Sequence, residues 1–290
     1  MLEGDGCDDV HLKLENHQET GSFKLRGACN KLLLMDESLR SRGIVTASTG
    51  NHGAAVARSA RRLGVPARVF VPGNADPSKI ASMQHDGAVI EQVGSDCVES
   101  EEAARDHAEA HGLAYVSPYN DPDVVAGQGS IGVELLRQME SVDTVFIAMG
   151  GGGLISGVGL YLKSHLPDVE ICACSPENSA VMHHSLEAGR LLEMESLPTL
   201  SDGTAGGVES GSITYELCHK AVDRSILVTE AEIAASMRGL IGDQHLMVEG
   251  AAAMAVAAFL KERERHAGKR VAIVLCGANV SRSVLCEVLK

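Results

Sequence analysis

The fold of this 290-residue chain is indicated most clearly by one segment, Thr144-Val145-Phe146-Ile147-Ala148-Met149-Gly150-Gly151-Gly152-Gly153. Its first six residues form an apolar run with β-branched side chains, which is typical of a buried strand in a parallel sheet. The glycines end that strand, and the residues at 154–166 are compatible with a helix. A strand that passes through a glycine turn into a helix is the repeating unit of α/β proteins.

Six further apolar runs rich in valine and isoleucine repeat this pattern along the chain. Longer amphipathic segments separate them, and glycine, proline or a polar turn follows each run. The runs cover residues 43–47, 67–71, 88–93, 114–117, 169–174 and 271–276. We therefore expect seven strands, in one large sheet or in two sheets, with helices between them.

Three local signals predict helix ends. Asp76 places a carboxylate before Pro77, which favours a capped helix start. Thr229 and Glu232 have the spacing of a capping box. Gly112 is expected to close the acidic helix that precedes it.

Composition and charge exclude several classes of partner and location. With 25 Lys and Arg against 39 Asp and Glu, the net charge is −14, which disfavours binding to nucleic acid or to an anionic membrane. Eight irregularly spaced cysteines indicate neither a disulfide framework nor a zinc site. The acidic start at residues 1–6 is unlike a signal peptide, and the apolar stretch at 251–260 is too short to span a bilayer. We expect a cytoplasmic protein in which this stretch is a buried helix.

The four glycines at 150–153 also predict a phosphate-binding loop. Without Cβ atoms the backbone N–H groups can approach an anion closely, and the following helix adds the positive end of its dipole. No Gly-Lys-Ser/Thr sequence follows, and no acidic residue is clearly placed for a ribose, so a single phosphate is a simpler ligand than a nucleotide. The alternative is a tight turn without a ligand, which would need only one or two glycines.

A second candidate is Lys24, in the segment Ser22-Phe23-Lys24-Leu25-Arg26-Gly27-Ala28. Ser22 is suited to cap a helix that reaches Met35, which would place Lys24 in the first turn. A cation there opposes the helix dipole, and burial adds to this, so the pKa of the amine should fall toward the range of a Schiff-base nucleophile. The alternative is an ordinary surface lysine.

Polar turns follow two of the other predicted strands. Ser48 to His52 comes directly after the strand at 43–47, and its N–H groups and side chains could bind a carboxylate and a phenolic oxygen. Cys276-Gly277-Ala278-Asn279 follows the last strand, where ligands of open α/β sheets tend to bind. The alternatives are a plain turn and a core thiol at Cys276.

Taken in chain order, the four motifs resemble those of the serine/threonine dehydratase family of fold-type II pyridoxal phosphate enzymes. The resemblance covers nearly the whole chain and includes Ala126-Gly127-Gln128-Gly129 and Val248-Glu249-Gly250-Ala251. It implies a tryptophan synthase β-like α/β fold with two three-layer α/β/α domains, largely parallel sheets, and the cofactor between the domains. We expect a large domain at 1–44 and 124–290 and a small inserted domain at 45–123.

The resemblance also implies a role for each matching residue. Lys24 would hold pyridoxal 5′-phosphate as a Schiff base and later take the Cα proton, with Phe23 flanking the cofactor. Asn51 would bond the 3′ oxygen of the cofactor, and Cys276 would meet its pyridine nitrogen. The expected phosphate ligands are Gly150, Gly151, Gly152, Gly153 and Leu154. The expected substrate-binding residues are Ser48, Thr49, Gly50, His52, Tyr119 and Glu249.

The implied reaction is β-elimination from L-threonine or L-serine, which gives 2-oxobutyrate or pyruvate and ammonia. A thiol at Cys276 cannot keep the pyridine nitrogen protonated, which favours elimination over transamination. Serine racemase is an alternative, because Thr49 supplies the hydroxyl that racemases of the family use as a second acid and base. Another alternative is a dehydratase for a hydroxyectoine-derived amino acid, 3-hydroxyaspartate or phenylserine. A third is a silent protein that binds the cofactor without catalysis, but the presence of Lys24 argues against it.

The chain departs from the family pattern in three places. Only about twenty residues precede the lysine segment, where family members normally have a helix and a strand. Ser175 and Val181 stand where metal-binding members carry carboxylates, so we expect no such metal. The chain ends soon after Cys276, so we expect no amino-acid-sensing regulatory domain. A homodimer is the family expectation.

Overall fold

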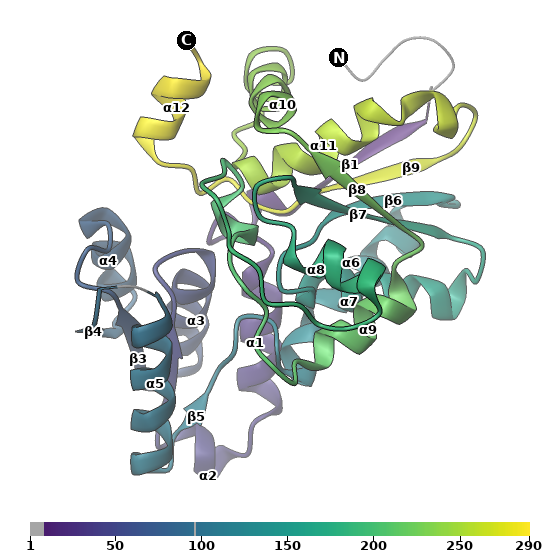
Figure 1. Cartoon of the computed structure of the whole chain (residues 1–290). Helices are drawn as coiled ribbons and strands as arrows, with labels where there is room; N and C mark the ends of the chain where they lie inside the picture. The colour runs from purple at the N-terminus through teal and green to yellow at the C-terminus, as the bar shows by residue number, and fades with distance from the viewer. Residues whose placement is uncertain (1–8, 96) are drawn as a thin grey trace. The chain divides into compact units, whose positions relative to one another are not determined.

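The computed structural model describes residues 9–95 and 97–290 and divides the chain into two compact units (Figure 1). The first unit contains the chain up to Gly21 together with Gln128–Lys290, and the second contains Ser22–Gly127. The boundary falls within helix α6 (Pro122–Gln138). Residues 1–6, on which the expectation of no export signal rests, lie outside the described residues.

The first unit is built on a five-stranded parallel sheet in the order β1-β9-β6-β7-β8. Its strands are β1 (Val10–Leu14), β6 (Thr144–Ala148), β7 (Glu170–Pro176), β8 (Arg224–Val228) and β9 (Val271–Leu275). Every residue of β6 and β9 is buried. All carboxyl ends of these strands lie at one edge, since the strands are parallel, and the glycine loop and Cys276 follow two neighbouring ones.

Helices cover both faces of this sheet (Figure 1). On one side α11 packs against four of the five strands, and α10 lies against α11. On the other side α7 packs against β6 and α9. The helices of this unit are α7 (Gly153–His165), α8 (Val181–Ala188), α9 (Ile213–Ala221), α10 (Glu230–Gly242), α11 (Gly250–Lys261) and α12 (Arg282–Val288), with the short η1 (Glu15–His17), η2 (Asp202–Thr204) and η3 (Arg263–His266).

Helix α11 is the buried helix that the apolar stretch at 251–260 predicts. Its residues from Gly250 to Phe259 are buried. In the described part of the chain, no helix combines the length and the hydropathy that crossing a bilayer requires.

The second unit has a four-stranded parallel sheet in the order β4-β3-β2-β5. Helix α3 packs against α1, α4 and the sheet, and α5 packs against β2, β3 and β5. The strands are β2 (Ile44–Ala47), β3 (Ala67–Val71), β4 (Val89–Gln92) and β5 (Ala114–Tyr115). The helices are α1 (Lys24–Leu34), α2 (Glu37–Arg40), α3 (Asn51–Leu63), α4 (Pro77–His85) and α5 (Cys97–His111).

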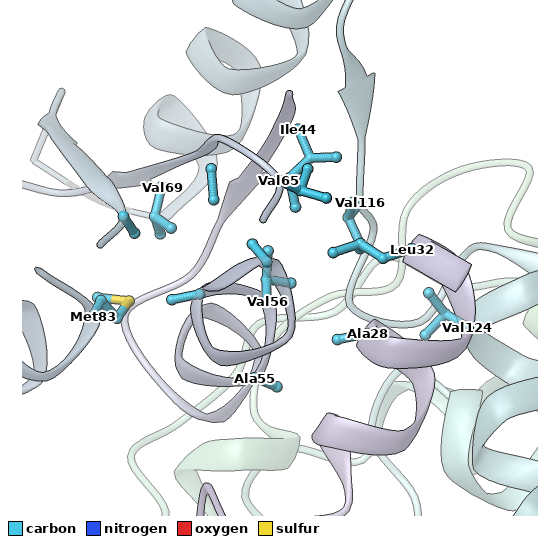
Figure 2. Close-up of a cluster of buried hydrophobic side chains, with 14 of the residues drawn as sticks. Ala28, Leu32, Ile44, Ala55, Val56, Val65, Val69, Met83, Val116 and Val124 are labelled. Carbon is cyan, nitrogen blue, oxygen red and sulfur yellow. The ribbon is translucent and has the colours of Figure 1, made fainter. Parts of the chain in front are cut away.

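The division of the chain differs from the expected boundaries on the N-terminal side. Residues 22–44, expected in the larger domain, belong to the smaller unit, because helix α1 contributes to its core. Figure 2 shows Ala28 and Leu32 of α1 beside Val56 of α3, and all three side chains are fully buried. Burial of these apolar side chains fixes α1 to this unit.

All seven predicted strands are present, each within two residues of its expected ends. The two strands that the sequence analysis missed, β1 and β8, are the edges of the five-stranded sheet. Their sequences, VHLKL and RSILV, mix charged with apolar residues, because an edge strand is covered on fewer sides than a central one. The sequence allows one large sheet or two sheets, and the structure has two.

The predicted helix ends are confirmed. The Asp76 side chain accepts a hydrogen bond from the Ser78 N–H, and Pro77 occupies the first turn. Gly112 follows α5 with a φ of +61°, a left-handed conformation that favours glycine. At α10 the Thr229 side chain accepts from the Glu232 N–H, and Glu232 accepts from the Thr229 N–H.

The capping box of α10 gives a stability prediction. Thr229→Ala removes the hydroxyl that accepts from the Glu232 N–H, so we expect the free energy of unfolding to fall by about 1 kcal/mol. Thr229→Ser keeps that oxygen and should stay within a few tenths of a kcal/mol of the wild type. Urea denaturation followed by circular dichroism measures both variants. Equal losses in the two variants would mean that the methyl group, and not the cap, is responsible.

Candidate active site

The glycine loop of the first unit is shaped by neighbours that occupy the space of the missing side chains. A Cβ on Gly150 would lie 2.8 Å from Cα and the carbonyl oxygen of Thr204. A Cβ on Gly152 would lie 2.6 Å from Sγ of Cys218, and Gly152 has a φ of +84°. Neither position therefore accepts a larger residue without movement of the surrounding backbone or core.

The carbonyl groups of the loop are held in fixed orientations. The Thr214 hydroxyl donates to the Gly151 carbonyl at 2.6 Å, and the Ser156 N–H donates to the Gly152 carbonyl at 3.0 Å. Thr214 itself lies in the capped first turn of α9, where its N–H donates to the Ser212 hydroxyl. These contacts fix the direction of the peptide groups in the loop.

The N-terminus of α7 is buried and has no side-chain cap. Its N-cap residue is Gly152, its first turn contains no acidic residue, and Gly153, Leu154 and Ile155 are buried. The first N–H groups of a helix have no partner within the helix, and a buried donor without a partner is costly. An anion such as a phosphate satisfies these donors and the helix dipole together, so the loop and the first turn of α7 fit a phosphate group.

The segment that ends in η2 was not identified from the sequence, although it borders this loop. Thr204 packs on Gly150, and a Cβ on Gly203 would lie 3.5 Å from a carboxylate oxygen of Glu249. The Leu200 carbonyl oxygen lies 2.0 Å from the position of a Cβ on Gly250. The sequence 200–204 reads as an ordinary polar loop, because its role depends on contacts with residues far away in the chain.

A buried carboxylate lies at the carboxyl end of β9. Glu249 is 3% exposed, and one of its oxygens accepts from the Asn279 N–H at 3.1 Å. Its other oxygen is 4.0 Å from Sγ of Cys276, a residue that is also buried. The Glu249 N–H donates to the Gly277 carbonyl, so the start of α11 and the end of β9 are tied together. Asn279 belongs to the sequence motif after the last strand, but the motif alone predicts no role for it in the site.

In the second unit Lys24 is the first residue of α1. Its Nζ donates to the Pro118 carbonyl at 2.7 Å and lies 5.2 Å from the centre of the Phe23 ring. The residue after Pro118 is Tyr119, which is half-buried. The fold therefore brings Phe23, Lys24 and the 118–119 turn together.

The prediction that Ser22 caps α1 is wrong. The residue at the N-cap is Phe23, and no side chain caps this helix end. Ser22 is fully buried, and its hydroxyl has no hydrogen-bond partner among the described residues. The helix starts one residue later than a serine cap requires, so the Ser22 side chain points into the protein interior and not at the helix N–H groups.

The loop after β2 leads directly into α3. Ser48, Thr49 and Gly50 form the turn, and Asn51 and His52 already belong to the first turn of α3. The Ser48 hydroxyl accepts from the Gly50 N–H at 3.2 Å. No atom lies within 4 Å of the Cβ position of Gly50, so the turn has open space at that point.

His52 differs from its neighbours because it is buried, with 3% of its surface exposed. Its Nε2 lies 3.0 Å from the Val116 carbonyl and donates to it, whereas Nδ1 has no hydrogen-bond partner among the described residues. Burial, reinforced by the positive charge of Lys24, lowers the pKa of His52 from 6.5 to about 3. His52 is therefore neutral at physiological pH and presents an unpaired acceptor inside this unit.

Comparison with protein families matches residues 2–277 to the model described as pyridoxal-phosphate dependent enzyme. An L-threonine ammonia-lyase of Thermotoga maritima is 41% identical over 281 residues, which is 97% of this chain and 70% of that protein.

Among solved structures, the processed form of threonine deaminase isoform 2 from Solanum lycopersicum matches with a TM-score of 0.91 and 32% identity, over 96% of this chain and 82% of that one. Maize serine racemase matches with a TM-score of 0.90 and 31% identity, over 96% of this chain and 85% of the other. The fold is that of these enzymes, as the resemblance had implied.

The lowered pKa of His52 gives a prediction about pH. An unfolded histidine binds a proton near pH 6.5, but folded His52 does so only near pH 3, so the unfolded state binds more protons between these values. The contribution of His52 to the free energy of unfolding is present above pH 6.5 and is lost as the pH falls toward 3. We expect wild-type stability to fall more steeply than that of His52→Gln from pH 6.5 to 4.5, by up to about 1.4 kcal/mol per pH unit.

Urea midpoints and m-values at several pH values measure this difference. The matched control is His85→Gln, because His85 lies on the exposed side of α4. The explanation is wrong if His52→Gln and wild type lose stability in parallel on acidification.

Proposed function

Because the chain belongs to the family of pyridoxal-phosphate dependent enzymes, we propose that it is an ammonia-lyase that converts L-threonine, L-serine or both into 2-oxobutyrate or pyruvate plus ammonia. The observation that carries the proposal is the uncapped, buried N-terminus of α7 behind a glycine loop, which fits the phosphate of the cofactor. The match to an L-threonine ammonia-lyase over 97% of the chain supports the choice of reaction.

The residues that match the family's motifs would hold the cofactor. The loop Gly150 to Gly152, with Gly153 and Leu154, would bind its phosphate, and Lys24 would hold it covalently. Phe23 would flank the ring, Asn51 would bond its 3′ oxygen, and Cys276 would face its pyridine nitrogen. When bound, pyridoxal phosphate withdraws electrons from the substrate Cα, so that the Cα proton becomes acidic and the β-hydroxyl can leave.

Two features support Lys24 as the general base. Its amine is partly buried, and the Pro118 carbonyl accepts one of its N–H bonds, which orients the nitrogen. Once it is neutral, Nζ can take a proton from the substrate Cα. His52 is neutral and adds no second positive charge beside Lys24. Binding of a substrate carboxylate would therefore not depend on protonation of the His52 ring.

The turn after β2 would hold the substrate carboxylate. Ser48, Thr49 and Gly50 are partly exposed, and open space lies at Gly50. The backbone N–H groups of a strand-to-helix turn suit a carboxylate because the helix dipole favours an anion. Tyr119 and Glu249 would contact the remainder of the substrate, which makes them candidates for determining the preferred side chain.

The thiol of Cys276 would act on the cofactor ring without protonating it. A thiol is a weak donor, so it cannot stabilise a positive pyridine nitrogen as a carboxylate does. This favours loss of a β-substituent over transamination. We further propose a cytoplasmic homodimer that binds the cofactor and a small hydroxy amino acid.

Release of 2-oxo acid tests the proposal. The panel is L-serine, D-serine, L-threonine, L-threo-3-hydroxyaspartate and L-phenylserine, with cofactor added. We expect 2-oxobutyrate from L-threonine or pyruvate from L-serine, and at least a thousandfold loss of turnover in Lys24→Ala, of the order typical for loss of a covalent catalytic group.

Lys24→Arg is the matched variant, because it keeps a positive charge at the start of α1 but cannot hold the cofactor covalently. It should be folded and as inactive as Lys24→Ala. Turnover that survives in either variant would show that a different amine serves as the base.

A serine racemase is the second candidate, and Thr49 is the observation that favours it. Its hydroxyl lies in the partly exposed turn between β2 and α3. The likeness to maize serine racemase agrees with this alternative. Accumulation of D-serine without 2-oxo acid, abolished by Thr49→Ala but retained in Thr49→Ser, would replace the ammonia-lyase by the racemase.

The bond from Thr214 to Gly151 gives a prediction about cofactor affinity. Thr214→Val keeps the shape of the side chain but leaves the Gly151 carbonyl without its donor, which costs about 1–3 kcal/mol when the group is buried. We expect the affinity for pyridoxal phosphate to fall roughly tenfold to a hundredfold. Absorbance titration of the cofactor-free protein measures this loss.

Thr214→Ser retains the hydroxyl and is the matched control. Pyridoxal, which lacks the phosphate, should bind wild type and Thr214→Val equally. If the variant weakens both ligands to the same extent, Thr214 acts on the fold of the unit and not on the phosphate loop.

A further inference from the structure

Helix α8 gathers three metal-ligating side chains that the proposed reaction does not use. They are His183, His184 and Glu187, and one ligand atom of each lies within 4.8 Å of the other two. Nε2 of His183 and Nδ1 of His184 are each 3.5 Å from the same oxygen of Glu187. Ligand atoms of a tetrahedral ion with bonds of about 2.0–2.1 Å are about 3.4 Å apart, so two edges of such a site are already present.

The ring of His183 is held by a contact on the side away from Glu187. Its Nδ1 lies 2.6 Å from the hydroxyl of Ser225 on β8, and only 8% of the side chain is exposed. When Nδ1–H donates to this hydroxyl, the lone pair of Nε2 is directed toward Glu187. Metal-binding histidines are usually oriented in this way by a second hydrogen bond.

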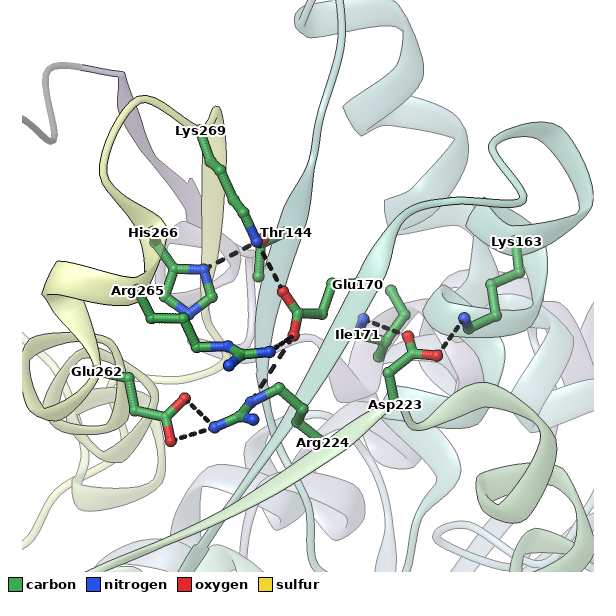
Figure 3. A network of polar contacts seen from close by, with 10 residues as sticks. All are labelled: Thr144, Lys163, Glu170, Ile171, Asp223, Arg224, Glu262, Arg265, His266 and Lys269. Carbon is green, nitrogen blue, oxygen red and sulfur yellow. Dashed lines mark hydrogen bonds and ion pairs between the residues drawn. The ribbon is translucent and has the colours of Figure 1, made fainter.

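In a second cluster of the same unit, cationic side chains already balance the charge of the carboxylate. Glu170, Cys172 and His266 also bring ligand atoms within 4.8 Å of one another. Figure 3 shows Glu170 paired with Arg224, Arg265 and Lys269, so its charge is already balanced. Burial raises the pKa of the Cys172 thiol to about 12, which keeps it protonated. This cluster has no need of a cation.

Glu187 lacks such compensation. In the part of the chain that the structure describes, its ion pairs are with His183 and His184 alone, and the last turn of α8 contains no basic residue. A carboxylate near a helix C-terminus opposes the dipole, and a bound cation there is favoured by it. Glu187 is 64% exposed, so an ion can reach the site from solvent.

We propose that His183, His184 and Glu187 form a binding site for a borderline divalent cation, of which Zn²⁺ is the type. Two imidazoles and one carboxylate are ligands that this class of ion prefers, and water would complete the coordination. The ion would fix the last turn of α8 to β8 through His183 and Ser225. The site is distinct from positions 175 and 181, at which the sequence predicts no metal.

Calorimetric titration of the holoenzyme with ZnCl₂, after removal of free cofactor and metals, tests the proposal. A background of Cys97→Ser and Cys286→Ser removes the two thiols that are exposed in the described part of the chain, which would also bind this ion. We expect one equivalent of Zn²⁺ to bind at micromolar concentration. His183→Gln and Glu187→Gln should each weaken this binding at least tenfold.

His111→Gln is the matched control, because it removes one of the two stacked rings His107 and His111 on α5 and leaves α8 intact. It should retain the high-affinity equivalent. A melting temperature that Zn²⁺ raises in wild type but not in Glu187→Gln would add an independent readout. The proposal is overturned if no stoichiometric binding occurs, or if His111→Gln abolishes binding while the two α8 variants retain it.

Discussion

The structure depends on the connection between β6 and α7, where a fully buried strand leads into a helix with a buried N-terminus through a loop that contains three glycines. Parallel strands leave their N–H and C=O groups satisfied only within the sheet, so the turn that follows must find its own partners. Thr214 and Ser156 provide them for two carbonyl groups, and Thr204 and Cys218 fill the space beside Gly150 and Gly152. At the positive end of α7, no side chain of the described residues provides a cap.

That constraint explains why most of the fold could be predicted from the sequence. Strands such as β6 and β9 are covered on both faces, so their sequences are continuous apolar runs, and their ends coincide with glycine or polar turns. The edge strands β1 and β8 could not be found in this way, because charged residues such as Lys13 and Arg224 are tolerated there and form ion pairs with other elements. The start of α1 was misjudged for a related reason, since a serine is a cap only if the backbone places it at the helix end.

The candidate site was predictable to a different degree in its different parts. Lys24, the glycine loop and the turn at 48–52 carry local sequence signals, because each combines a strand or helix end with an unusual set of residues. Thr204 and Thr214 carry none, since their importance rests on contacts with residues more than twenty positions away. A threonine that begins an ordinary capped helix cannot be distinguished, in sequence, from one that also holds the carbonyl of a binding loop.

The candidate site residues differ in how completely their buried polar groups are satisfied. In the first unit an oxygen of Glu249 and the carbonyls of Gly151 and Gly152 accept hydrogen bonds from the protein, which orients these groups. In the second unit the Ser22 hydroxyl and Nδ1 of His52 are buried without a hydrogen-bond partner among the described residues. Unpaired buried groups cost free energy that a ligand or an ordered water can recover, so a ligand that bonds to Ser22 or His52 would lower this cost. Both unpaired groups belong to segments that the sequence motifs identify, Ser22 in the segment of Lys24 and His52 in the turn after β2, so hydrogen-bonding capacity is left where those motifs predict a ligand.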